Sequence, residues 1–297
     1  MTGPERSGGG VTGVTVAVVP ARHGRTARVR AGFGAVLRQP GLVLAFVVLL
    51  VVIAWAFAPG FFAHQDPVNG VPAERLQGPS PHHLFGTDHI GRDIYSRVVH
   101  GSSLTLRSTL LAVVVGLVVG GGIGMLAGFV GRWVDDVLMR VIDVMLAIPG
   151  LLLSLAVVTA LGFGTVHVAI AVGVSNIAGF ARVMRAETLK VRALSYVESS
   201  HSLGSRWTYT LGAHVLPNAA GPVLALSALE FGTAILAISS LSFLGFGAQP
   251  PAPEWGALVS DGRSYLDTAW WMTTFPGLTV TAVVLSANRV ARYLERI

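Results

Sequence analysis

The chain alternates between long apolar segments and shorter segments rich in glycine, proline or arginine. A hydrocarbon core about 30 Å thick needs roughly 20 helical residues to cross it. Six apolar segments are long enough, at residues 41–59, 104–130, 138–161, 165–185, 218–242 and 270–291. The segment 165–185 is the least uniform, because Asn176 and Gly179 interrupt it. The pattern therefore predicts an all-α membrane protein with six transmembrane helices.

Among the polar side chains of these segments, Asp143, Asn176 and Glu230 stand at positions where lipid is expected. A carboxylate at bilayer depth costs on the order of 3 kcal/mol unless it faces a cavity or a partner. We therefore expect all three to face the bundle interior, and they are candidate pathway residues. For Glu230 the alternative is a protonated or hydrogen-bonded packing group.

Glycine recurs at every fourth position of the second apolar segment, at Gly116, Gly120, Gly124 and Gly128. Residues four apart share one face of a helix, and glycine on that face lets another backbone approach closely. We expect a second helix against this face, either from this chain or from another.

Composition supports the membrane assignment and limits the chemistry. Hydrophobic residues make up 52% of the chain and charged residues 12%, whereas a soluble domain carries about 25% charged residues. The absence of cysteine excludes disulfides, thiolate metal sites and cysteine nucleophiles. The net charge of +6 comes from arginines that flank apolar segments, which indicates membrane topology rather than nucleic-acid binding.

Charge placement orients the chain. With a cytoplasmic N-terminus, 16 of the 21 lysines and arginines lie inside, in the sense of the positive-inside rule. The loops 60–103 and 243–269 then face the exterior, and both termini are cytoplasmic. The predicted parts are a disordered basic tail (1–35, unless translation starts further downstream), a first helix with its external loop (36–103), and a core domain with five helices (104–297).

Catalytic motifs are missing from the sequence. The single lysine, Lys190, does not belong to a Gly-x4-Gly-Lys-Ser/Thr phosphate loop. Neither Gly-x-Ser-x-Gly nor His-Glu-x-x-His occurs. We expect the chain not to be an enzyme, and if it belongs to a pump, ATP is hydrolysed on another polypeptide.

A polar island separates two apolar segments. It runs from Tyr196 through Glu198 to Gly204, and His214-Val-Leu-Pro217 follows nine residues later. The stretch 196–209 predicts two short amphipathic helices hinged at Gly204, where glycine tolerates a left-handed turn. Pro217 suits the first turn of the next helix. An amphipathic segment between membrane helices is typical of docking to a partner, with a surface segment lying on lipid as the alternative.

The spacing of Glu198, Gly204 and Leu216-Pro217 resembles the coupling loop of ABC-importer permease subunits. The segments 83–93 (HLFGTDHIGRD) and 241–256 (LSFLGFGAQPPAPEWG) resemble the dipeptide/oligopeptide/nickel branch of that family, specifically its second (C-type) permease. The resemblance runs from about residue 39 to about residue 288. It assigns ATPase coupling to Tyr196, Glu198, Ser199, Ser200, Gly204, Leu216 and Pro217, and external motifs to His83, Gly86, Asp88, Gly91, Arg92, Asp93, Gln249 and Glu254.

The resemblance implies the type I ABC importer permease fold with a cytoplasmic coupling loop at 190–217. It implies a second homologous permease, two ATPase domains that carry ATP and Mg, and an external solute-binding protein as partners in the cytoplasmic membrane, with no cofactor in this chain. The cargo would be dipeptides, oligopeptides or similar ligands. Asp143 matches an acidic position typical of the family, which favours a structural role.

The chain departs from the family pattern at three places. Ser199 and Ser200 stand where alanines are usual, and His214 replaces an aliphatic residue. After Asn288 the chain continues with Arg289 rather than the usual Gly-Asp pair. Any ATPase contact of the C-terminal tail is therefore in doubt.

The external segment also raises the question of a metal site, because it holds His82, His83, Asp88, His89 and Asp93. No two of these histidines have the i, i+4 spacing that presents two imidazoles to one ion. The aspartates suit helix caps or partners of Arg92. We therefore expect structural roles and no bound metal.

Two other classes of function stay open at this level. A self-contained secondary transporter or channel would show inverted repeats and broken helices, and no clear repeat is present. A membrane-embedded enzyme using the outer histidines and aspartates would bind metal in isolation.

Overall fold

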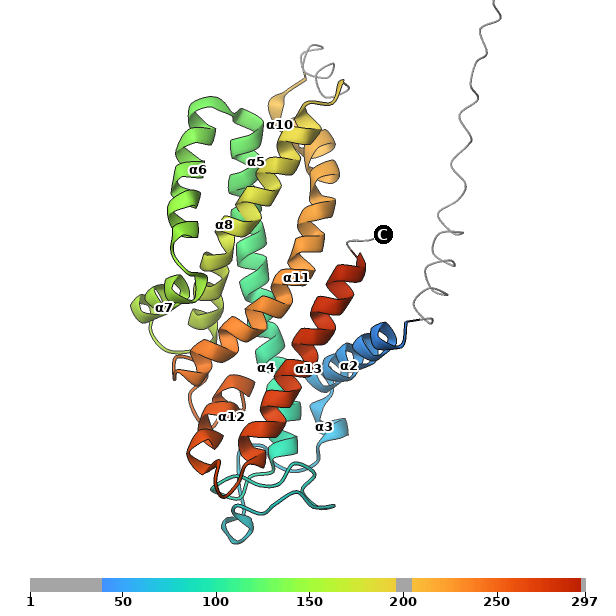
Figure 1. The fold of residues 1–297 in the computed structure, drawn as a ribbon, viewed down its shortest axis with the longest axis vertical. Helices are drawn as coiled ribbons and strands as arrows, with labels where there is room; N and C mark the ends of the chain where they lie inside the picture. Colours follow the sequence, from blue (N-terminus) through green and yellow to red (C-terminus); the bar gives the residue numbers. More distant parts are fainter. Residues whose placement is uncertain (1–38, 196–204, 295–297) are drawn as a thin grey trace, which may run out of the picture. The chain divides into compact units, whose positions relative to one another are not determined.

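The computed structural model describes residues 39–195 and 205–294. The predicted basic tail and the polar island from Tyr196 to Gly204 lie outside these residues. Helices dominate the described part of the chain (Figure 1). Within that part, the only bridge between extended segments joins Thr87 to Asp93. The all-α prediction is confirmed.

The long helices are α2 (Pro40–Phe57), α4 (Ile94–Val115), α5 (Gly121–Val130), α6 (Arg132–Ala147), α7 (Gly150–Leu161), α8 (Thr165–Arg192), α11 (Leu216–Phe243) and α13 (Trp271–Leu294). Short helical pieces are α3 (Pro59–Phe62), η1 (Pro72–Glu74), α10 (Trp207–Tyr209), α12 (Trp255–Gly262) and η4 (Arg263–Tyr265). Two π-helical segments, η2 (Gly116–Gly120) and η3 (Thr210–Val215), join α4 to α5 and α10 to α11.

Four helical runs are long and apolar enough to cross a membrane: Pro40–Phe57, Ile94–Val130, Thr165–Arg192 and Trp207–Phe243. The bent pair α6–α7 makes a fifth if it counts as one span. The predicted number of six is therefore not reproduced within the described residues. The sixth expected segment does form a helix, α13, but it is not among the described helices that are long and apolar enough to cross a membrane.

The predicted span 138–161 is broken rather than continuous. Helices α6 and α7 differ in direction by 97° at Ile148-Pro149. Proline has no N–H for the helix ladder and forces the preceding residue out of the helical region. Ile148 accordingly is extended, with φ −96° and ψ 129°, and α7 restarts at Gly150.

The glycine face of α4–α5 packs against α8 of the same chain. A Cβ built on Gly120 would lie closer than 3.0 Å to the carbonyl oxygen of Ile177, and one on Gly124 equally close to that of Ala181. Backbone thus contacts backbone along this seam. The expected close packing is confirmed, and its partner is intramolecular.

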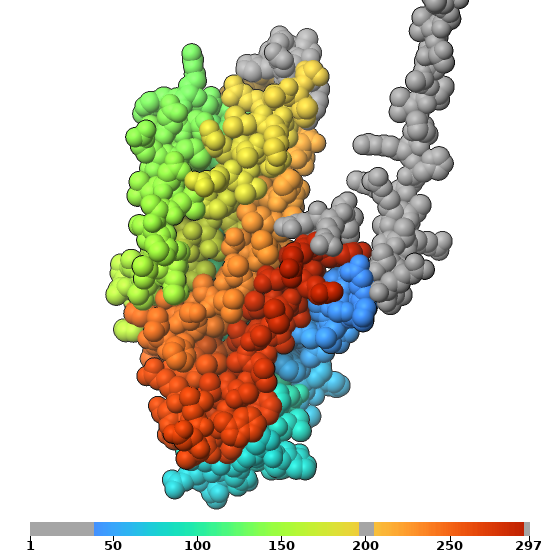
Figure 2. Space-filling view, viewed as in Figure 1, coloured from blue at the N-terminus to red at the C-terminus, as the bar shows by residue number. Residues whose placement is uncertain are grey.

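Two large clusters of buried side chains hold the helices together, beside a smaller one between α6 and α8. One lies among α4, α7, α8 and α11 and includes Phe180 and Ile238. The other joins α2, α4, α12 and α13 around Trp255. The outer faces carry exposed large apolar residues, such as Leu44 and Leu285, as expected of helices that face lipid. Figure 2 shows α11 (orange) and α13 (red) side by side at the surface.

Candidate functional site

The two flanks of the predicted coupling loop lie at one end of the helix bundle. Helix α8 ends at Arg192, whose Nη1 is 3.4 Å from the carbonyl oxygen of Gly128 near the end of α5. Helix α10 begins the other flank at the same end, opposite the loop between α3 and α4 (Figure 1). Five of the predicted coupling residues lie outside the described part: Tyr196, Glu198, Ser199, Ser200 and Gly204.

Pro217 was expected in the first turn of the helix after the coupling loop, and α11 (Leu216–Phe243) has it there. The expected apolar segment 218–242 is, however, part of a longer helical run that is continuous from Trp207 to Phe243, 37 residues. Pro217 lies in the first turn of α11, directly after the π-helical segment η3. The wider turn changes the hydrogen-bond pattern before the proline, so the chain stays helical despite the missing N–H.

Exposed apolar side chains gather on this flank. Trp207 and Tyr209 are 57% and 60% exposed, and Leu216 and Pro217 are also exposed. The ring of Tyr209 meets that of His214 edge-on, with centroids 5.7 Å apart. Sequence reasoning missed Trp207, although a tryptophan beside a polar island is itself a signal of a docking surface.

Asp143 does not face the bundle interior. Its side chain is 65% exposed and its Oδ1 accepts a hydrogen bond of 2.9 Å from Arg182 Nη2 of α8. The expectation of an interior position is therefore wrong, because an arginine on the neighbouring helix supplies the partner that the carboxylate needs. The structural hydrogen-bonding role fits this contact.

A second ion pair joins the same two helices. Arg185 Nη2 is 2.6 Å from Asp135 Oδ2, and Arg185 Nε contacts the other oxygen, which makes the pair bidentate. Such paired hydrogen bonds fix orientation as well as distance. Sequence reasoning did not find either pair, because the partners lie 39 and 50 residues apart.

The other candidate pathway residues have different surroundings. Asn176 is partly buried on α8 beside Gly116, and its Nδ2 has no hydrogen-bond partner. Glu230 on α11 is partly buried, and its Oε2 accepts a hydrogen bond of 2.8 Å from Thr233 of the same helix. No polar contact in the described residues joins Asp143, Asn176 and Glu230 to one another.

The first external motif forms a buried hydrogen-bonded turn. Asp88 accepts hydrogen bonds from the backbone N–H of Arg92 at 2.9 Å and from its Nε at 2.6 Å. Asp93 caps α4 by accepting from the Ser96 N–H at 2.7 Å. Gly86 and Gly91 have φ of +76° and +83°, which disfavours any residue with a Cβ. The aspartates are a helix cap and an arginine partner, as predicted.

The second external motif docks α12 onto α4. Glu254 is fully buried and caps α12, accepting from the N–H groups of Gly256 and Ala257 at 3.1 and 3.0 Å. Burial raises the pKa of Glu254, and the two amide hydrogen bonds oppose that rise. Trp255 Nε1 donates to the carbonyl oxygen of Val98 at 2.9 Å. The motif is thus a rigid connector, and Gln249 is exposed.

Arg97 connects the two external motifs. It is 2% exposed, its Nη1 lies 3.3 Å from the carbonyl oxygen of Pro67, and its guanidinium is 3.9 Å from both Asp88 and Asp261. A cavity of about 150 Å³ adjoins it, lined also by Gln249 and Asp261. The sequence does not reveal these distant partners of Arg97, because nothing local to α4 indicates them.

Comparison with known protein families supplies the decisive observation. Residues 120–296 match the family described as "Binding-protein-dependent transport system inner membrane component". This chain belongs to that family.

Curated relatives of this transport family align along most of the chain. A dipeptide transport system permease protein of Alkalihalophilus pseudofirmus is 37% identical over 249 residues, 84% of this chain and 80% of the relative. A glutathione transport system permease protein of Pectobacterium atrosepticum is 40% identical over 254 residues, 85% and 84% of the two chains. The predicted resemblance to permeases of the peptide branch is confirmed.

Solved structures support the fold. An amino acid ABC transporter crystallised with histidines matches with a TM-score of 0.52 at 18% identity, over 68% of this chain and 94% of that one. An inward-facing methionine ABC transporter matches with a TM-score of 0.53 at 17% identity, over 67% and 96%. The expected ABC importer permease fold is confirmed, and the chain is a multi-pass membrane protein. The family match includes both flanks of the predicted coupling loop, whereas the first external motif precedes it.

Proposed function

We propose that this chain is the transmembrane permease subunit of an ATP-driven importer for dipeptides, oligopeptides or similar small ligands. The observation that carries the proposal is the alignment with peptide and glutathione permeases over more than four fifths of the chain. The absence of a phosphate loop from the sequence supports a division of labour, with ATP and Mg on a separate ATPase.

The partners follow from this division of labour. A second homologous permease would complete the pathway, two ATPase domains would dock at the coupling loop, and an external solute-binding protein would deliver the cargo. In this arrangement both termini and the loop 190–217 are cytoplasmic, in the sense that the positive charges favour. The two external motifs then face the binding protein's side.

The coupling loop would transmit movement through the helices that flank it. Trp207, Tyr209, Leu216 and Pro217 offer exposed apolar surface where the loop rejoins the bundle. Helix η3 continues into α11 without a break, so movement of this flank carries the whole run to Phe243. Closure of the ATPase pair would therefore tilt α11 and alternate access between the two faces.

Helices α6 and α8 would move together. The pairs Asp135–Arg185 and Asp143–Arg182 cross-link them at two levels, which supports a structural rather than a transport role for Asp143. Asn176 and Glu230 are the remaining pathway candidates. Their partly buried polar groups are costly in a membrane interior and would be useful beside a polar cargo.

Co-purification with an ATPase tests the proposal. The tagged chain is expressed with the products of its neighbouring genes, and the complex is assayed for retained ATPase and for ligand-stimulated ATP hydrolysis. Glu198→Arg is compared with Asp267→Arg, which places the same charge change on an exposed residue of the opposite loop.

We expect the wild-type chain and Asp267→Arg to retain the ATPase, and Glu198→Arg to lose it or its ligand stimulation. Full stimulation in Glu198→Arg would place coupling elsewhere. A wild-type chain that transports ligand without any ATPase would contradict the importer proposal and favour a self-contained carrier or channel.

A further inference from the structure

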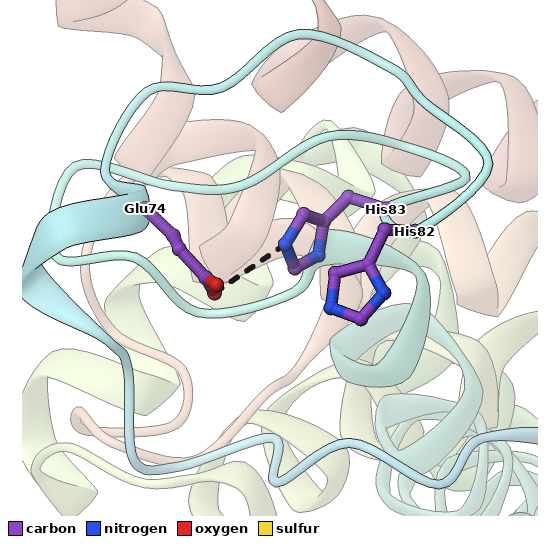
Figure 3. A group of neighbouring side chains, drawn as sticks. All are labelled: Glu74, His82 and His83. Carbon is purple, nitrogen blue, oxygen red and sulfur yellow. Dashed lines mark ion pairs between the residues drawn. The ribbon is translucent and has the colours of Figure 1, made fainter.

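A cluster in the loop between α3 and α4 takes no part in the function proposed above. It consists of Glu74 at the end of η1 and the adjacent residues His82 and His83 (Figure 3). One potential ligand atom from each side chain lies within 4.8 Å of the other two. Glu74 was not among the candidate ligands in the sequence, because only the folded loop brings it to the histidines.

The ring of His83 is held in one orientation. The side chain is 2% exposed, and Nδ1 lies 3.0 Å from Oδ1 of Asp93, so this nitrogen donates to the carboxylate. Asp93 is fixed in turn, because its other oxygen caps α4. A neutral imidazole that donates at Nδ1 has an unprotonated lone pair at Nε2.

That lone pair faces a second carboxylate. His83 Nε2 is 3.5 Å from Glu74 Oε2 and has no hydrogen-bond partner. Two electron-rich atoms facing one another with little water between them repel, unless a positive charge lies between them. Either a second proton on His83 or a bound cation would supply that charge.

The geometry favours a cation. Zinc ligands lie at about 2.0–2.1 Å from the ion, so two ligands of a tetrahedral site are about 3.3 Å apart. The observed separation of 3.5 Å between His83 Nε2 and Glu74 Oε2 is close to this ligand–ligand distance. Metal-bound histidines commonly donate their other ring N–H to a carboxylate, which is the role that Asp93 has toward His83.

The backbone of the cluster is already positioned. The Thr87 hydroxyl donates to the carbonyl oxygen of Glu74 and accepts from the N–H of Gln77 at 2.8 Å. The N–H of Ser80 donates to the carbonyl oxygen of His83 at 2.8 Å. His82 is exposed, with its ring edge-on to that of His83 at a centroid separation of 4.7 Å. Only this exposed ring has to turn to complete a three-ligand set.

We propose that Glu74, His82 and His83 bind a divalent transition-metal ion of the zinc class, with Asp93 as the positioning residue for His83. Two imidazoles and one carboxylate match the nitrogen and oxygen ligands that zinc accepts, and they leave a fourth position for water. The ion joins η1 to the turn that precedes α4 and thereby stabilises the loop. This site is independent of the transport function and of any ATPase.

Cobalt provides a spectroscopic probe for zinc-type sites. The full-length chain is purified in nanodiscs through a tag without histidine and titrated with Co²⁺, followed by displacement with Zn²⁺. We expect one Co²⁺ per chain with the intense visible absorption of a tetrahedral site. Glu74→Gln and His82→Ala should each weaken binding about tenfold or more, since even outer partners of metal ligands are worth that much.

His64→Ala is the matched control, because His64 is an exposed histidine of the same loop outside the cluster. It should bind Co²⁺ like the wild type. Absence of Co²⁺ and Zn²⁺ binding at micromolar concentration would overturn the proposal. Binding that is unchanged in both Glu74→Gln and His82→Ala would overturn it as well.

Discussion

At the scale of single residues, the external motifs place charged groups where charge is costly. Glu254, Arg97 and Asp88 are all buried, and each has charged or backbone partners. A buried ion that loses its partner costs several kcal/mol, so such groups specify one arrangement of the chain. The motifs therefore fix how α4, α12 and the outer loop meet.

Glu254 should make stability depend on pH. Burial raises its pKa above 4.5, so above that pH the native chain binds more protons at this site than the unfolded chain. The free energy of unfolding should therefore fall as pH rises through the raised pKa. We expect Glu254→Gln to flatten this dependence in melting temperatures measured from pH 4.5 upward. Asp267→Asn, an exposed carboxylate change, should leave it intact.

At the scale of helices, the seam between α4–α5 and α8 depends on missing side chains. Helices in lipid gain little from the hydrophobic effect and associate through close packing instead. Helix α8 packs closely against the glycine face of α4–α5, which consists of Gly116, Gly120, Gly124 and Gly128. The π-helical segment η2 lies within the same seam.

Two glycines of this region form a matched pair for mutation. A Cβ on Gly120 meets the backbone of α8, whereas a Cβ on Gly122 meets nothing within 4 Å. Gly120→Ala should destabilise the chain by about 1–3 kcal/mol through overpacking. Gly122→Ala should be neutral or stabilise by up to about 1 kcal/mol, because alanine is the better helix former. Melting temperatures of both variants in nanodiscs check this prediction. Equal melting temperatures would contradict close packing of Gly120 against α8.

Helix positions could be predicted from the sequence where length and apolarity decide, because the membrane leaves few alternatives to a helix. The break at Pro149 was visible in the sequence, but a proline in a membrane helix can be accommodated by neighbouring groups, so its effect was not determined locally. The early start of the run at Trp207 depends on a π-helical segment, which hydrophobic periodicity does not reveal.

The candidate site was harder to predict from the sequence than the fold. Helix caps such as Asp93 follow from local spacing and were predictable. The partners of Asp143, Arg97 and Glu74 come from other elements, and a single sequence contains no signal for them. Asp143 was predicted to face the bundle interior because an unpaired carboxylate in a membrane costs free energy. The sequence did not show that Arg182 of α8 is its partner.

At the scale of the whole molecule, the two ends of the described chain differ in character. The end formed by the loop before α4 and by α12 is held together by buried hydrogen bonds and ion pairs. The opposite end carries exposed aromatic residues on α10. One end held by buried polar contacts and an opposite end with exposed aromatic side chains would suit the proposed subunit, which receives force from an ATPase on one side.

Trp207 should contribute to docking of that partner. Its side chain is 57% exposed in the isolated chain. Tryptophans that become buried when a partner binds are among the strongest contributors to binding free energy. Trp207→Ala should weaken ATPase co-purification by about tenfold or more while the yield of folded chain is retained. Trp270→Ala, an exposed tryptophan at the opposite end, should leave co-purification unchanged. Equal retention in both variants would exclude α10 from the docking surface.

The unbroken helical run from Trp207 to Phe243 has a mechanical consequence. Its 37 residues span about 55 Å, nearly twice the thickness of the hydrocarbon core. Such a rod is a lever, and when it pivots near its midpoint a rotation of about 10° displaces each tip by about 5 Å. Neighbouring strands of a sheet lie about 4.8 Å apart, so this displacement is about the width of one extended peptide backbone. If the proposed import function holds, a rotation of this size, driven at one end of the helix, would be enough to admit or exclude an extended peptide at the other end.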